Sequence, residues 1–254
     1  MPRESSQQDP YVGTASAYDL LNASGRPEQV AAMRALLPLL QPEYGPVLDI
    51  GAGSGMNSAL VLEEVPEATV FALEPSPAMR ALAMGRLAQE AAWSTRVTLW
   101  PYDYFSAPLP ETIAGAVMMG SLGHFDESER RAVFMDLAGR LPAGGAVLVD
   151  LPEPTRPQRV EAEVVSTAQL GELTYRTMVE GWPDGEDAMR WRMTYLTHHG
   201  QDVILETTSE HVFRHPDPDD VASEARAAGL EMEQVGQTTY WLLVKADERE
   251  AQVA

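Results

Sequence analysis

The sequence predicts an α/β protein built on a doubly wound, mostly parallel sheet. Apolar segments of strand length alternate with helical segments between residues 46 and 151, and one apolar run leads directly into a glycine-dense turn. Alternation of this kind places helices on both faces of a parallel sheet. Over residues 160–214 the pattern changes to strand-like segments separated by turn residues, which predicts an antiparallel insertion. A chain of 254 residues that is 44% hydrophobic can bury a sizeable core.

Two helices are expected ahead of the sheet, over residues 15–21 and 28–40. Gly25 suits the C-cap of the first helix, and Pro27 suits the first turn of the second. Ser76, followed by a proline, marks the start of a later helix, because serine is a favoured N-cap. The core elements are expected in this order: strand 46–50, helix 55–64, strand 68–73, helix 77–91, strands 96–100 and 114–119, helix 127–140 and strand 145–151. The insertion and the end of the chain should then form strands 161–167, 173–180, 189–196 and 203–213, helix 218–228, and strands 231–236 and 239–245.

The glycine-dense turn carries the clearest functional signal. It follows a short apolar strand and reads Asp49-x-Gly51-x-Gly53-x-Gly55, with a helix after it. Glycines at these positions allow a tight turn and a close approach of the backbone to a ligand. The next apolar run ends at Glu74, 19 residues after Gly55, where a carboxylate that binds ribose hydroxyls is expected. Together these features predict a nucleotide-like ligand at the carboxyl ends of the strands.

A dinucleotide is disfavoured as that ligand. Its fingerprint, G-x-G-x-x-G, needs a third glycine where this chain has Met56, and that glycine allows tight packing of the helix on the strand. A nicotinamide-dependent oxidoreductase is therefore the weaker interpretation. A turn of the same shape that binds no ligand is the alternative without function.

The amino-acid composition disfavours several classes of binding partner and several types of site. With 18 basic and 38 acidic residues the chain carries a formal charge of −20, which disfavours nucleic acid and an anionic membrane and is compatible with a neutral or cationic small molecule. The absence of cysteine excludes disulfides, cysteine zinc sites and a cysteine nucleophile. The polar N-terminus lacks the apolar core of a signal peptide, and no apolar run is long enough to span a membrane, so a cytoplasmic protein is expected.

The turn resembles the first motif of the class I S-adenosylmethionine (SAM) dependent methyltransferases, whose glycine loop faces an amino-acid tail and not a phosphate. Nearly the whole chain shares this resemblance. It looks most like small-molecule enzymes, similar to bacterial amino-sugar N,N-dimethyltransferases and glycine N-methyltransferase-like enzymes. The features that suggest this subgroup are the insertion, Tyr18-Asp19-Leu20 followed by Gly25-Arg26, and Ser121-Leu122-Gly123-His124-Phe125 after the fourth strand.

The resemblance implies a Rossmann-like, doubly wound, seven-stranded sheet whose last strand is antiparallel, with an antiparallel β insertion after the fifth strand and an N-terminal helical lid. The chain then divides into a leader and lid (1–40), a SAM-binding core (41–157), a substrate-covering insertion (158–215) and a C-terminal completion of the core sheet (216–254). The first 14 residues are expected to be a loose leader, and residues 246–254 a frayed tail.

The resemblance also implies roles for residues around the turn. Asp49 would order the loop and approach the SAM ammonium group, Glu74 would accept hydrogen bonds from the ribose hydroxyls, and Asp103 would receive the adenine amino group. Carboxylates suit these positions, because they accept hydrogen bonds from groups that donate. The complete implied set of cofactor contacts is Asp49, Gly51, Gly53, Gly55, Glu74, Pro75, Met79, Asp103, Tyr104 and Gly120.

The acceptor side depends on what is methylated. Methyl transfer needs the acceptor held in line with the methyl group; an amine needs only its free lone pair, whereas a hydroxyl needs a base, usually histidine. His124 is the candidate base, with a packing or capping histidine as the alternative, and Tyr18 could orient the acceptor or only anchor its helix. An amine is the favoured acceptor, and an O-methyltransferase acting on a hydroxyl or carboxylate with His124 as base is the alternative.

Aromatic residues of the insertion could form a roof over the acceptor or simply pack as strand residues: Tyr175, Trp182, Trp191 and Tyr195. Neither the Asn-Pro-Pro-Tyr signature of planar-nitrogen methylation nor the acidic metal set of catechol O-methyltransferases is visible, so metal-independent transfer is expected. His211 and His215 have the four-residue spacing of a helical zinc pair, but they lie in a segment with a strand pattern. That strand pattern argues against a metal site. A catalytically inactive SAM-binding regulatory protein stays open as another class, and so does the choice between monomer and homodimer.

Overall fold

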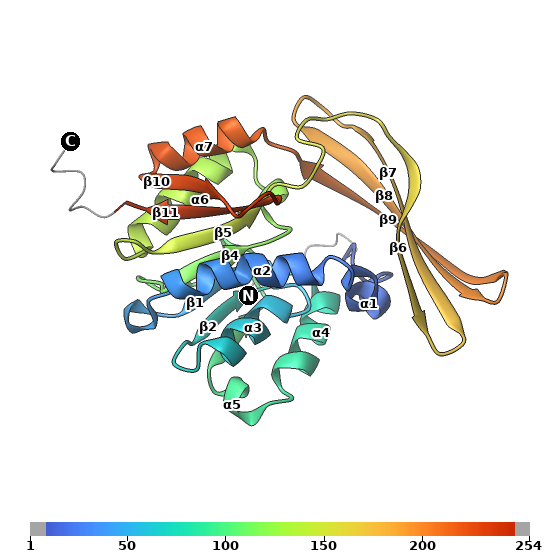
Figure 1. The fold of residues 1–254 in the computed structure, drawn as a ribbon, viewed down its shortest axis with the longest axis horizontal. Helices are drawn as coiled ribbons and strands as arrows, with labels where there is room; N and C mark the ends of the chain where they lie inside the picture. Colours follow the sequence, from blue (N-terminus) through green and yellow to red (C-terminus); the bar gives the residue numbers. More distant parts are fainter. Residues whose placement is uncertain (1–8, 247–254) are drawn as a thin grey trace.

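The computed structural model describes residues 9–246, which form two β-sheets with helices around the larger one (Figure 1). The larger sheet has seven strands in the order β10-β11-β5-β4-β1-β2-β3, and the smaller has four in the order β6-β7-β8-β9. Neighbouring strands among β1 to β5 are parallel to one another, and β11 is antiparallel to both β5 and β10. The predicted fold class is confirmed, including the antiparallel last strand and the insertion after the fifth strand.

The elements follow the expected order along the chain. The strands of the large sheet are β1 (Val47–Ile50), β2 (Val70–Leu73), β3 (Val97–Trp100), β4 (Gly115–Met118), β5 (Ala146–Asp150), β10 (Leu230–Gln234) and β11 (Tyr240–Lys245). The α-helices are α1 (Tyr18–Asn22), α2 (Arg26–Leu36), α3 (Met56–Glu64), α4 (Pro77–Leu87), α5 (Ala91–Ser94), α6 (Glu127–Arg140) and α7 (Pro218–Ala227). The short 3-10 turns are η1 (Ala15–Ala17), η2 (Leu37–Leu39), η3 (Pro42–Tyr44) and η4 (Leu122–His124). The small sheet consists of β6 (Val160–Leu170), β7 (Leu173–Pro183), β8 (Ala188–His199) and β9 (Asp202–Arg214).

The central strands carry continuous apolar runs because both of their faces are covered. Every residue of β1 and of β4 is buried. One core cluster, which includes Met33 and Leu62, packs under α2, α3 and α4, and a second, which includes Phe134, packs under α6 and α7. The parallel strands are thereby fixed between two helical layers, and their carboxyl ends open together at one edge of the sheet.

The small sheet stands beside that edge, and α1 lies against β6 and β7 (Figure 1). Ser166 of β6 donates its hydroxyl hydrogen to the carbonyl oxygen of Leu21 over 2.5 Å. Gly13 lies so close to β9 that a Cβ there would come within 2.5 Å of Thr207 Cγ2. The described N-terminal segment is therefore docked onto the insertion.

Several local expectations are wrong. Gly25 is not a left-handed C-cap, since its φ is −82° and it is the N-cap of α2. The helix expected over 28–40 ends at Leu36 and continues as a 3-10 turn, because Pro38 cannot donate the next helical hydrogen bond. The helix expected over 77–91 divides into α4 and α5. Residues 9–14 are not loose, since Thr14 is 1% exposed, while the rest of the expected leader and nearly all of the expected tail lie outside the described residues.

Within residues 9–246, no helix is both long enough and apolar enough to cross a membrane.

Candidate active site

The β1–α3 loop approaches the end of β4 so closely at Gly51 that no side chain would fit. The φ of Gly51 is +71°, in the left-handed region, and a Cβ at this position would overlap Ser121 Oγ. Gly53 and Gly55 also have positive φ values, at +58° and +78°. Ser121 donates its hydroxyl hydrogen to the carbonyl oxygen of Ile50 over 2.9 Å, which ties the two strand ends together. The predicted glycine turn therefore presents backbone, not side chains, at this edge of the sheet.

Glu74 closes the other side of the loop. Its carboxylate accepts hydrogen bonds from the Gly53 N–H and the Ser76 N–H, each at 2.7 Å, and the residue is 6% exposed. Burial raises the pKa of Glu74, while the two backbone donors act in the opposite direction. Each carboxylate oxygen keeps a lone pair for a further donor. Glu74 thus lies beside the loop as the sequence indicates, and its contact with ribose stays a prediction.

Two opposite charges flank the base of the loop. Asp49 is 3% exposed and accepts a hydrogen bond from Ser58 Oγ at 2.5 Å; burial raises the pKa of Asp49 to about 6. Arg26 donates to Asn57 Oδ1 at 2.7 Å and to the carbonyl oxygen of Met56 at 2.9 Å. Among residues 9–246 no carboxylate forms an ion pair with Arg26. The half-buried guanidinium therefore keeps its charge beside the loop without a bonded carboxylate.

Two aspartates fasten the N-terminal segment over the loop. Asp19 of α1 accepts a hydrogen bond from Ser54 Oγ at 2.5 Å and pairs with Arg86 of α4. Asp9 accepts a hydrogen bond from Ser76 Oγ at 2.8 Å. Asp9 could not be predicted from the sequence, because an acidic residue in a polar leader has no distinguishing local pattern. The N-terminal segment is thus held both at the glycine loop and at the start of α4.

A row of rings runs from this segment to the end of β4. The ring centroids of Tyr18 and Tyr11 lie 6.3 Å apart, and those of Tyr11 and His211 lie 5.2 Å apart. His211 stacks on Phe213 at 5.6 Å, and Phe213 contacts His124 at 4.7 Å. Burial raises the pKa of Tyr18 to about 12, so its phenol stays protonated at neutral pH. The alternation of side chains along the expected strand 203–213 puts His211 and Phe213 on one face and could have identified that pair.

His124 lies at the end of the row, in η4. Its ring packs against Phe213 and is otherwise exposed, and within the described part of the chain its ring nitrogens form no hydrogen bond. Partial burial lowers the pKa of His124, and the neighbouring His211 and Arg214 lower it further. The ring is therefore neutral at pH 7, with a nitrogen free to accept a proton. Its catalytic role stays a prediction.

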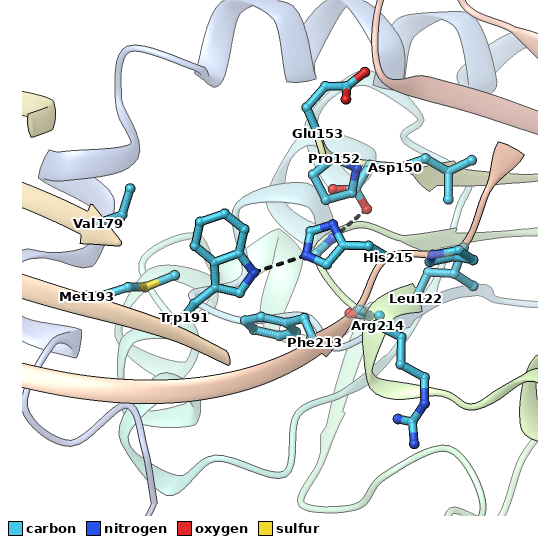
Figure 2. Close-up of a pocket in the computed structure, with 15 residues that line it drawn as sticks. Leu122, Asp150, Pro152, Glu153, Val179, Trp191, Met193, Phe213, Arg214 and His215 are labelled. Atoms are coloured by element: carbon cyan, nitrogen blue, oxygen red, sulfur yellow. Dashed lines mark hydrogen bonds between the residues drawn. The ribbon is translucent and has the colours of Figure 1, made fainter. Parts of the chain in front are cut away.

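A pocket of about 260 Å³ opens between the ends of β4 and β5 and the small sheet (Figure 2). Its walls include Gly120 and Asp150 from the large sheet and Trp191 and Phe213 from the small one. Ser121, which contacts the glycine loop, also lines the pocket. This pocket is therefore adjacent to the predicted cofactor edge and is the candidate acceptor site. Sequence analysis missed Asp150, which reads as an ordinary strand end.

Among the four predicted roof residues, Trp191 alone lines this pocket. Strand alternation places Tyr195 on the same face of β8 as Trp191, near Tyr18 of the N-terminal segment. Tyr175 pairs with Thr197 and shares that face, but it lies further along the sheet. The roof therefore consists of one pocket residue and two neighbours on its face.

Trp182 lies on the opposite face of the small sheet, so its predicted place in the roof is wrong. Gly181 is the residue of β7 that pairs with Trp191, and side chains alternate between faces along a strand. The Trp182 ring instead lies under the guanidinium groups of Arg159 and Arg192, at 5.9 and 5.1 Å.

The other predicted cofactor contacts are only partly together. Tyr104 is buried in the core, where its hydroxyl donates to Asp136 Oδ2 over 2.6 Å, so a side-chain contact between Tyr104 and the cofactor is not supported. Asp103 is exposed in the turn before it, and Pro75 is exposed ahead of α4. Met79 is buried against the glycine loop. The contacts of these three residues with the cofactor stay predictions.

His215 fixes the orientation of Trp191. The indole N–H of Trp191 donates to His215 Nε2 over 3.0 Å (Figure 2). On the other side of the ring, His215 Nδ1 lies 2.7 Å from the carbonyl oxygen of Pro154. Because an indole N–H only donates and a carbonyl only accepts, His215 is the neutral tautomer with Nδ1 protonated. His211 instead bonds Ser209 Oγ at 3.1 Å. Over the described range, no three histidine, aspartate or glutamate side chains gather as metal ligands would.

Known proteins resemble this chain in its glycine loop and in the strands around that loop. Residues 47–145 match a family described as a methyltransferase domain. Trans-aconitate 2-methyltransferase of Rhodopseudomonas palustris (strain BisB5) is 32% identical over 122 residues, which cover 47% of this chain and 42% of that relative. The chain thus aligns with less than half of the length of this curated relative.

Solved structures share the fold over nearly the whole chain. DesVI of Streptomyces venezuelae has a TM-score of 0.71 and 24% identity, covering 92% of this chain and 99% of that one. SAM-bound CalS10, an amino pentose methyltransferase of Micromonospora echinaspora, has a TM-score of 0.70 and 18% identity, covering 96% of this chain and 100% of that one. At these identities the likeness shows the fold alone.

His215→Gln should remove part of the pH dependence of stability. Burial lowers the pKa of His215 in the folded protein, so below about pH 6.5 the unfolded chain takes up a proton that the folded protein resists. Between pH 7 and pH 5 the wild type should therefore lose more free energy of unfolding than His215→Gln, as measured by chemical denaturation at both pH values. The surface variant Asp220→Asn is the control. An equal loss in wild type and His215→Gln would show that folding does not lower the pKa of His215.

Proposed function

We propose that the chain binds SAM at the β1–α3 loop and transfers its methyl group, without a metal, to an amine or hydroxyl of a small molecule in the adjacent pocket. The observation that carries this proposal is the placement of two buried carboxylates at one glycine loop, Glu74 and Asp49. Carboxylates repel phosphates, whereas they accept hydrogen bonds from ribose hydroxyls and an ammonium group. The match of residues 47–145 to a methyltransferase domain supports the same function.

The charges around the loop also fit an amino-acid tail. Asp49 and the carbonyl oxygen of Gly120 suit an ammonium group, and Arg26, which has no bonded carboxylate among residues 9–246, suits a carboxylate. When bound, SAM supplies a sulfonium methyl group that the acceptor's lone pair takes up as the S–C bond breaks and its electron pair returns to sulfur. The chain's own task is then to hold the acceptor in line and to exclude water.

The acceptor side supports an amine first and a hydroxyl second. An amine needs only positioning by the pocket, and CalS10 is itself an amino pentose methyltransferase. The neutral, unbonded ring of His124 supports the second candidate, an O-methyltransferase in which His124 removes the hydroxyl proton. A pocket beside the loop favours a transferase over a SAM-binding regulatory protein.

Two ligands test the two ends of the cofactor site separately. S-adenosylhomocysteine carries the amino-acid tail and 5′-methylthioadenosine lacks it, while both carry the ribose. Arg26→Met should weaken S-adenosylhomocysteine about tenfold or more and leave methylthioadenosine unchanged, because only the first ligand has a carboxylate. Glu74→Gln should weaken both ligands, because its amide places a donor where a hydroxyl must donate. Isothermal titration gives the affinities.

The exposed Glu67→Gln serves as the control for a lost surface charge and should bind both ligands normally. Equal weakening of the two ligands by Arg26→Met would contradict the placement of the tail. Binding of NAD without binding of S-adenosylhomocysteine would contradict the cofactor itself.

His124→Ala separates the two acceptor classes. For a hydroxyl acceptor, kcat should fall about a hundredfold or more, and its pH profile should lose an ionisation in the histidine range. For an amine acceptor the fall should be much smaller, because no base is required. Affinity for S-adenosylhomocysteine should be unchanged, and the exposed His199→Ala is the matched control. Wild-type kcat with every accepted substrate would make His124 a packing residue.

A further inference from the structure

The pocket beside the glycine loop is walled mainly by apolar side chains. They come from η4 and from three strands of the small sheet: Leu122, Val179, Trp191, Met193 and Phe213. Figure 2 shows the Trp191 ring reaching His215, with the Phe213 ring below it. Such walls favour an apolar ligand, because binding removes the apolar surfaces of both the ligand and the walls from water.

One carboxylate interrupts these walls. Asp150 is the last residue of β5, and its Oδ1 accepts a hydrogen bond from the Gly120 N–H at 2.7 Å (Figure 2). Within residues 9–246, Oδ2 accepts no hydrogen bond from another side chain or backbone group. Surrounding protein raises the pKa of Asp150 to about 6, so the group is ionised at pH 7. An ionised oxygen in an apolar pocket is costly unless a donor meets it.

The cationic side chains around the pocket do not meet that oxygen. Arg214 is the single arginine or lysine among the described lining residues; its Nε lies 3.3 Å from Asp187 Oδ2, and Figure 2 shows its side chain turned away from Trp191. His215 is neutral, and both of its ring nitrogens are already bonded. The pocket therefore offers a free negative charge among apolar walls.

We propose that Asp150 binds the ammonium group of the acceptor, and that the acceptor is an amine carried on an apolar body without phosphate. This inference rests on the proposed function and specifies its substrate class. An ammonium N–H would donate a charge-assisted hydrogen bond to Oδ2, and the apolar body would cover Trp191 and Phe213. That proton would pass to Oδ2 or to water before transfer, so that the freed lone pair of the nitrogen can take up the methyl group. The Asp150 carboxylate would repel a phosphate, and Arg214 is the one cationic lining residue that could offset this repulsion. The net charge of −20 also attracts a cation to the pocket.

Three probes of similar shape test the inference by calorimetry on protein saturated with S-adenosylhomocysteine. They are 2-phenylethylamine, 2-phenylethanol and 3-phenylpropanoate, which are cationic, neutral and anionic. The wild type should bind the amine most tightly and the carboxylate least. Asp150→Asn keeps an oxygen for the Gly120 N–H, and it should weaken the amine about tenfold or more while leaving the alcohol unchanged. A purely structural role for Asp150 would not separate the amine from the alcohol.

Two further variants complete the design. Asp220→Asn removes the same charge from an exposed site and should bind the amine as the wild type does. Phe213→Ala should weaken the amine and the alcohol alike, and it tests the pocket even if Asp150→Asn does not fold.

Three results would overturn the inference. They are unchanged amine affinity in folded Asp150→Asn, no effect of Phe213→Ala on either ligand, and tighter binding of glucosamine 6-phosphate than of 2-phenylethylamine. If the wild type fails to bind S-adenosylhomocysteine at all, the proposed function fails instead.

Discussion

Gly51 holds the β1–α3 loop against Ser121 at the end of β4, in a left-handed conformation that leaves no room for a side chain. This contact joins the two halves of the proposed site, because Ser121 bonds the carbonyl oxygen of Ile50 on the loop side and also lines the acceptor pocket. A larger residue at Gly51 would push the loop away from β4. In-line displacement is sensitive to small losses of alignment, so the proposed chemistry depends on this close approach.

The N-terminal segment contacts the same glycine loop and also connects it to the small sheet. Asp19 bonds Ser54 on the glycine loop, Asp9 bonds Ser76 at the start of α4, and Gly13 packs against Thr207 on β9. One short segment therefore contacts the loop, the helix that follows Glu74 and the small sheet. Its two tyrosines, Tyr11 and Tyr18, belong to the row of rings that ends at His124. The same segment therefore lies beside both the proposed cofactor site and the acceptor side.

The strand, glycine turn and helix could be predicted because their constraints are local: an apolar run, positions that need positive φ, and the N-cap Ser76, whose hydroxyl accepts from the Met79 N–H at 3.1 Å. The predicted place of Trp182 was wrong because the register of β7 with β8 decides which face of the strand meets the pocket. No local sequence pattern fixes that register. Asp150 could not be recognised either, since its free oxygen becomes evident only when the small sheet closes the pocket around it. Local signals thus gave the cofactor edge, while the acceptor side depended on contacts between distant segments.

The most direct test of the central claim is a crystal structure of the protein with S-adenosylhomocysteine. The account predicts the ribose hydroxyls at Glu74, the amino-acid tail between Asp49 and Arg26, and the sulfur facing the pocket that Asp150 and Trp191 line. A ligand bound away from the glycine loop, or one whose sulfur points away from that pocket, would contradict it.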